Sequence, residues 1–73
     1  MAARPLDLEV MHGRRHLDDG VFKATGDPAD GAWLQGQLRD WLTAKGWQGS
    51  RWREFELIAR PAGQNRRIAT VRT

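Results

Sequence analysis

The sequence predicts a small α+β domain in which one helix covers a four-stranded sheet, in the order strand, strand, helix, strand, strand. The chain has 73 residues, enough for one hydrophobic core, so residues 1–73 are expected to form a single domain. Its 40% hydrophobic and 29% charged residues are typical of a folded chain. Apolar side chains recur every second residue toward both ends of the chain and with a helical period in the middle.

The first hairpin is predicted from strict alternation near the start of the chain. The alternating apolar positions are Leu6, Leu8 and Val10. We expect a strand over residues 6–12 with one face on the core. An Asp-Asp-Gly turn signal follows, and a second strand is expected over residues 21–25. The intervening residues 13–19 are expected to form a mobile loop, and periodicity leaves open whether residues 14–17 extend the hairpin.

A helix is predicted between the two pairs of strands. Asp27 is expected to accept from the free amides of the first turn, and Pro28 to occupy the first helical position, where no N–H is needed. Lys45 followed by Gly46 favours a helix end at about residue 45. The apolar positions share one helical face and are Trp33, Leu34, Leu38, Trp41 and Leu42. This face is expected to pack on the sheet, with Arg39 toward solvent.

The last third of the chain predicts a second hairpin. We expect strands over residues 51–60 and 66–72, joined by a turn over residues 61–65 that contains Pro, Gly and Asn. One face of the first strand carries Phe55, Leu57 and Ala59, and the other carries Trp52, Glu54, Glu56 and Ile58. Two topologies fit this order: a β-grasp-like sheet with its first and last strands parallel in the middle, and a pair of hairpins sharing one antiparallel sheet.

Composition argues against several classes of protein. The chain has no cysteine, so neither a disulfide framework nor a Cys-based zinc site is available. The longest apolar stretches have three residues, against roughly 20 for a membrane-spanning helix. The N-terminal residues lack the apolar region of a signal peptide. We therefore expect a cytoplasmic protein without a membrane partner.

The two histidines are weak candidates for metal binding or catalysis. His12 and His16 stand four residues apart, a spacing that would suit a metal on a helix, but Gly13 and the strand signal argue against a helix there. A third and weaker interpretation is a small enzyme that pairs a histidine with Asp18 or Asp19. The chain offers one serine, no tyrosine and no Gly-rich phosphate loop in a strand–loop–helix context. We expect no enzymatic activity, no metal and no cofactor.

Positive charge is concentrated in the last third of the chain. The net charge is +3. Residues 1–50 hold six basic and seven acidic side chains, which gives −1, whereas residues 51–73 hold six arginines and two glutamates, which gives +4. Such a concentration is typical of a surface that meets phosphates or an acidic protein, although a solvated surface would look the same.

The favoured function is therefore a small non-enzymatic module that binds nucleic acid or a nucleoprotein complex through the second hairpin. The candidate binding residues are Arg51, Trp52, Arg53, Arg60, Arg66, Arg67 and Arg72. Arginines clamp phosphates and indoles stack on bases. Arg66 and Arg67 are expected to begin the last strand and to point to opposite faces, with at least one of them reaching solvent near Arg53 or Arg60. Glu54 and Glu56 weaken this hypothesis because they share a face with Trp52.

The alternative function is a protein-interaction module, such as an inhibitor or accessory protein of the kind made by mobile elements. It would use an exposed strand edge or an aromatic patch. Trp33, Trp41 and Trp47 are expected to belong to the core or its rim. An exposed tryptophan would instead favour a protein contact.

Overall fold

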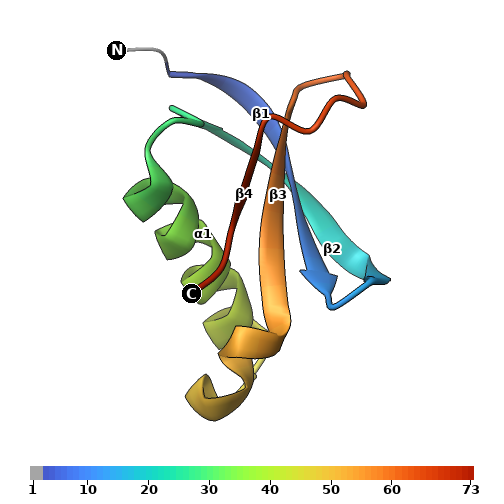
Figure 1. The fold of residues 1–73 in the computed structure, drawn as a ribbon, viewed down its shortest axis with the longest axis vertical. Helices are drawn as coiled ribbons and strands as arrows, with labels where there is room; N and C mark the ends of the chain where they lie inside the picture. Colours follow the sequence, from blue (N-terminus) through green and yellow to red (C-terminus); the bar gives the residue numbers. More distant parts are fainter. Residues whose placement is uncertain (1–2) are drawn as a thin grey trace.

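The computed structural model describes residues 3–73, and these residues form an α+β domain with one α-helix on a four-stranded sheet (Figure 1). The elements are β1 (Arg4–His12), β2 (Arg15–Gly26), α1 (Gly31–Ala44), the 3-10 helix η1 (Gly49–Glu54), β3 (Phe55–Pro61) and β4 (Ala69–Val71). The predicted fold class is confirmed. No helix within residues 3–73 has both the length and the apolar character required to cross a membrane.

The sheet is antiparallel throughout, in the order β2-β1-β3-β4. Each hairpin contributes one inner and one outer strand, and the hairpins join where β1 pairs with β3 from Leu6↔Pro61 to His12↔Phe55. The pair of hairpins is therefore the topology adopted. The β-grasp-like alternative is wrong because β4, the last strand, lies at an edge and pairs only with β3.

The first hairpin is longer than predicted. The expected loop over residues 13–19 is wrong, because β2 begins at Arg15 and only a two-residue turn separates it from β1, with Gly13 at φ 64°. The register shifts between Glu9 and Met11, where β2 carries extra residues. This bulge lets Leu17 and Phe22, which lie an odd number of residues apart, both pack against the core. Strict alternation in the sequence is lost there, so periodicity did not reveal the strand.

The helix begins three residues later than predicted. Its N-cap is Asp30, whose Oδ1 accepts from Trp33 N at 3.1 Å, and the predicted cap, Asp27, instead accepts from Ala29 N at 2.9 Å in a preceding turn. The ring of Trp33 lies against Gly26, where an added Cβ would come within 2.4 Å of it. The predicted C-terminus is confirmed, with a cap at Lys45.

The core lies between α1 and the facing side of the sheet. Its buried residues are Leu6, Leu8, Val10, Leu34, Leu38, Leu42, Phe55, Leu57 and Ala59. The half-buried residues Trp33, Trp41 and Trp47 pack against this cluster, which confirms that they belong to the core rim. Arg39 is exposed, so the predicted faces of the helix are also confirmed.

The second hairpin is shorter than predicted at both strands. Residues 51–54 are 3-10 helix, and β4 starts at Ala69 rather than Arg66. Along a strand, Trp52 would point to the side opposite Phe55, away from the core. The 3-10 turn removes this conflict, because it returns the indole of Trp52 to the core cluster. The face assignment for Trp52 and Glu54 as strand residues is therefore wrong, whereas Glu56 and Ile58 do lie opposite the core side.

Truncating Leu38 tests the packing of α1 on the sheet. Leu38 is fully buried in the core cluster. Leu38→Ala should lower the free energy of unfolding by about 2–4 kcal/mol, measured by urea denaturation, because it removes apolar contacts and leaves a cavity. The exposed neighbour provides the control, and Arg39→Ala should change it by less than about 0.5 kcal/mol. Equal losses for the two variants would contradict the assigned faces.

Adding a methyl group to glycine tests the bulge in β2. A Cβ at Gly20 would lie 2.6 Å from the carbonyl oxygen of Val10, a backbone atom that cannot rotate away. Gly20→Ala should therefore lower the free energy of unfolding by about 1–3 kcal/mol. The matched variant is Gly36→Ala in α1, where no atom lies within 4 Å of the new Cβ, and it should raise stability by up to about 1 kcal/mol. If Gly20→Ala left the free energy of unfolding unchanged, the bulge in β2 would be contradicted.

Candidate nucleic-acid interface

The first three predicted site residues lie on η1, at the lower end of the sheet in Figure 1. Arg51 and Arg53 are exposed, whereas Trp52 is half-buried. The amide of Gly13 donates to the carbonyl of Glu54 at 3.0 Å, which fixes the β1–β2 turn beside η1. The arginines of η1 and those of this turn therefore lie at one end of the molecule.

Arg51 is bound by an acidic neighbour. Its Nε and NH2 groups donate to the carboxylate of Glu54 at 3.1 and 3.0 Å, and its guanidinium lies over the ring of Trp47 at 5.2 Å. Nε2 of His12 lies 2.8 Å from Oε1 of Glu54. The hydrogen bonds from Arg51 and His12 lower the pKa of Glu54 to about 2. Arg51 therefore organises this corner of the fold, and its charge is largely neutralised.

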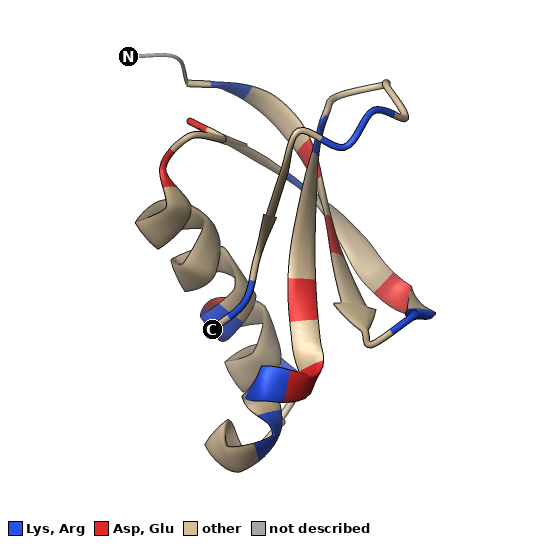
Figure 2. Cartoon of the chain, viewed as in Figure 1, with Lys and Arg blue, Asp and Glu red and all other residues tan. Residues whose placement is uncertain are grey.

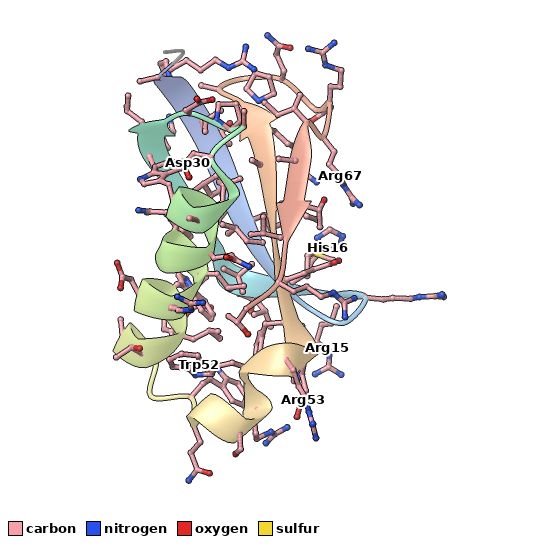
Figure 3. All side chains as sticks on the ribbon, turned by 60° about the vertical axis from the view of Figure 1, so that its left-hand side comes forward. Arg15, His16, Asp30, Trp52, Arg53 and Arg67 are labelled. Carbon is pink, nitrogen blue, oxygen red and sulfur yellow. The ribbon has the colours of Figure 1, made fainter. Side chains whose placement is uncertain are left out.

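Trp52 is a packing residue in this structure. Its indole N–H donates to the carbonyl of Trp47 at 3.0 Å, and its ring packs against the core cluster. In Figure 3, Trp52 lies on the α1 side of the sheet. An indole held in this way does not offer a free face for stacking on a base.

Arg60 and Arg72 pair with glutamates on the sheet face opposite α1. Arg60 NH1 donates to Oε1 of Glu9 at 2.9 Å, and Nδ1 of His16 lies 2.7 Å from Oε2 of the same carboxylate. Burial raises the pKa of Glu9, but the hydrogen bonds from His16 and Arg60 outweigh burial and leave the pKa below its ordinary value. Arg72 NH2 lies 3.7 Å from Oε2 of Glu56. Both arginines thus compensate carboxylates of the sheet.

Arg66 and Arg67 lie in the loop between β3 and β4 and are exposed. The expectation that they begin the last strand on opposite pleats is wrong, because the loop continues to Ile68, whose amide donates to the carbonyl of Ala59 at 2.9 Å. The loop follows Pro61, the residue after Arg60, so it lies at the Arg60 end of β3, whereas η1, which contains Arg53, lies at the other end of β3 (Figure 2).

Unpaired basic side chains outnumber unpaired acidic ones. Within residues 3–73, eight basic side chains form no ion pair or hydrogen bond: Arg4, Arg14, Arg15, Lys23, Arg39, Arg53, Arg66 and Arg67. Among the acids of the same region, five have no basic partner: Asp7, Asp18, Asp27, Asp30 and Asp40. Asp7, Asp27 and Asp30 accept from a backbone N–H, which leaves their negative charge in place. The unpaired charge is therefore positive, with eight cations against five carboxylates, in keeping with the net charge of +3.

Six of these eight cations form two clusters at opposite ends of the sheet. The upper basic end comprises Arg4, Arg66 and Arg67, and the lower basic end comprises Arg14, Arg15 and Arg53. The upper cluster is joined where Ala62 N donates to the carbonyl of Pro5 at 3.3 Å. Figure 3 shows Arg53 and Arg67 on the side of the sheet away from α1. The pairing of Arg15 with His12, and the shared parity of Arg4 with Leu6, place Arg4 and Arg15 on the α1 face instead.

Sequence reasoning missed Arg4, Arg14 and Arg15. The pair at the first turn was visible as two consecutive arginines after Gly13, but the charge balance of residues 1–50 concealed it. Arg14 and Arg15 become part of a candidate interface only because the long-range pairing of His12 with Phe55 brings η1 alongside their turn. No local pattern in the chain contains that information.

The two histidines do not form a common site. His12 stacks on Phe55 at 4.3 Å and contacts Glu54, whereas His16 contacts Glu9 on the other face of the sheet. No group of three potential metal ligands and no pocket occurs in the part of the chain that the structure describes. Comparison with protein-family models, curated proteins and solved structures gave no match.

The hydrogen bonds to Glu54 predict a dependence of stability on pH. With a folded pKa of about 2 and an ordinary value of 4.5, the stabilisation by Glu54 is present above about pH 4.5 and is lost as the pH falls toward 2. Glu54→Gln should therefore lower the melting temperature at neutral pH and converge on the unmodified protein in acid. Asp40→Asn, at an unpaired carboxylate, is the control. A Glu54→Gln difference that is constant between pH 7 and 2 would refute the charge-dependent contact.

Proposed function

We propose that this protein is a small non-enzymatic module that binds nucleic acid, or a nucleoprotein complex, through exposed arginines. The observation that carries the proposal is the surplus of eight unpaired cations over five carboxylates without a basic partner, with six of the cations at the two basic ends. An unpaired guanidinium binds a phosphate without first breaking an internal ion pair. This surface would attract a polyanion over the distance of a Debye length.

The two carboxylates that weaken the hypothesis at the sequence level are neutralised in the fold. Glu54 is bound by Arg51 and His12, and Glu56 faces Arg72. Arg51, Arg60 and Arg72 thus support the interface by compensating acids, and Arg53, Arg66 and Arg67 remain as direct phosphate ligands. Arg14 and Arg15 join them at the lower basic end.

The outer edge of β2 favours protein interaction as a second candidate function. This strand has 12 residues and pairs only with β1, so its other edge is free of strand partners. Val21 on this strand is 60% exposed and is the only large apolar side chain exposed in residues 3–73. An unpaired edge with an apolar side chain suits the addition of a strand from another protein.

Removing the loop arginines tests the proposed function. Arg66→Ala/Arg67→Ala should leave the circular dichroism spectrum and melting temperature unchanged, because both side chains are exposed and unpaired. Its affinity for a mixed-sequence DNA duplex of roughly 20 base pairs should fall, and the slope of log K against log salt should shrink by roughly two units, one for each phosphate contact. Fluorescence anisotropy across a salt series measures both quantities.

The control for this experiment is Arg39→Ala on the outer surface of α1. Arg39 is exposed and unpaired but lies outside both basic ends. It should leave the salt slope unchanged. If the double variant binds with the affinity and slope of the unmodified protein, the loop arginines are merely solvated and the proposed function loses its basis there.

A further inference from the structure

The loop between β3 and β4, residues 62–68, is anchored at both of its ends. Near β3, Gly63 N donates to Oδ2 of Asp7 on β1 at 3.1 Å, and Gly63 has φ 77°, a conformation that favours glycine. Near β4, Ile68 N donates to the carbonyl of Ala59 at 2.9 Å. The loop therefore leaves the sheet and returns to it at defined positions, at the end of β3 opposite η1 (Figure 1).

The middle of this loop consists of four consecutive polar side chains, Gln64, Asn65, Arg66 and Arg67. All four residues are exposed. Within residues 3–73, none of the four side chains forms a hydrogen bond or an ion pair. The loop also contains no acidic residue. A ligand can therefore bind these groups without breaking an internal contact or meeting a carboxylate of the loop.

The two kinds of side chain in the loop suit two different parts of a nucleic acid. The carboxamides of Gln64 and Asn65 each offer a donor and an acceptor, the pair that matches N7 and the N6 amino group of adenine in the major groove. They carry no net charge, so they contribute little to phosphate binding. The guanidinium groups of Arg66 and Arg67 bind phosphates strongly. The loop thus places two potential base-reading groups directly before two phosphate-binding groups.

The width of the loop is compatible with the major groove of duplex DNA. Ala59 pairs with Ala69, so the two limbs of the loop leave the sheet one strand spacing apart, roughly 4.8 Å. The major groove is roughly 12 Å wide, admits a two-stranded ribbon and has phosphates along both borders. The loop can therefore enter the groove with side chains on either side of its backbone.

Other nucleic acids suit this protein less well. The chain has four tryptophans and two phenylalanines, and all six belong to the core cluster or pack against it. Proteins that bind single strands usually stack the unpaired bases on exposed aromatic rings. The major groove of duplex RNA is too deep and narrow for side chains to read. Duplex DNA is therefore the ligand that the residues of this loop match.

We infer that the β3–β4 loop enters the major groove of duplex DNA, where Gln64 and Asn65 read adenines and Arg66 and Arg67 bind the adjacent phosphates. This inference rests on the proposed function and specifies its ligand and its mode of recognition. Phosphate contacts alone carry no sequence information, whereas hydrogen bonds to base edges do. The inference therefore adds a sequence preference that the surplus of positive charge does not produce.

A pool of DNA duplexes tests the sequence preference. Each duplex has roughly 20 base pairs with a randomised centre, and the duplexes that the full chain binds are sequenced. We expect enrichment of adenine at two neighbouring positions. In fluorescence anisotropy, the selected duplex should bind at least about tenfold more tightly than a scrambled duplex of the same composition. Equal affinity for the two duplexes would overturn the inference.

Removing the two carboxamides separates base reading from charge. Gln64→Ala/Asn65→Ala should lose the roughly tenfold preference for the selected duplex, but the slope of log K against log salt should stay unchanged because neither residue is charged. Arg66→Ala/Arg67→Ala should instead weaken binding to both duplexes and shrink the slope. Circular dichroism and the melting temperature should be those of the unmodified protein for both variants, since all four side chains are exposed and unpaired.

Gln48→Ala is the matched control for the carboxamides. Gln48 is an exposed glutamine outside the loop, and its side chain makes no capping hydrogen bond to η1. Its loss should change neither the sequence preference nor the salt slope. If Gln64→Ala/Asn65→Ala keeps the full preference, or if Gln48→Ala loses it to the same extent, the loop does not read the bases and the inference is overturned.

The outcomes distinguish this inference from the proposed function. Binding to all DNA duplexes with equal affinity and a steep salt dependence would overturn the inference and leave the nucleic-acid module in place. Tighter binding to one strand of the selected duplex, or to the corresponding RNA duplex, would overturn the major-groove contact. Failure to bind any of these nucleic acids at low salt would overturn both proposals and favour the β2 edge as a protein-binding site.

Discussion

The pairing of β1 with β3 is the interaction on which the rest of the structure depends. It joins two hairpins that are separated by the whole of α1, and it makes β1 and β3 the inner strands of the sheet. Leu8 and Leu57 thereby reach the middle of the face beneath α1, where both are almost fully buried. The same register carries His12 onto Phe55, so it also decides which turn lies beside η1. The register of β1 with β3 therefore determines both the core and the neighbours of η1 in the candidate interface.

This pairing also buries an acidic side chain on the sheet face opposite α1. An inner strand buries its side chains even where no second layer covers them, and Glu9 is only 7% exposed. A buried carboxylate needs compensation, since an unpaired buried charge costs several kcal/mol. Arg60 and His16 supply it from the neighbouring strands. Arg60 is consequently committed to the fold, which explains why an arginine that looks free in the sequence is not free in the molecule.

The parts of the fold predicted correctly are those set by local periodicity. Leu6, Leu8 and Val10 identify β1, and the 3.6-residue spacing identifies α1. The errors occur where a long-range requirement overrides the local pattern. Two aspartates compete to cap α1, and the packing of Trp33 against Gly26 accompanies the choice of the later one. In a regular strand, Leu17 would point to the face opposite Phe22, and Trp52 to the face opposite Phe55. A bulge in β2 brings Leu17 to the core, and the 3-10 turn of η1 brings Trp52 to it.

The candidate site was harder to predict than the fold because charge along the chain differs from charge in space. The last third of the sequence contains the surplus of arginines, but Arg51, Arg60 and Arg72 are paired once the strands assemble. The first fifty residues are acidic overall, yet Arg14 and Arg15 remain unpaired in the fold. What a polyanion would encounter is the remainder after internal pairing. That remainder depends on which strands are neighbours, and the sheet order determines it more than the composition of any segment does.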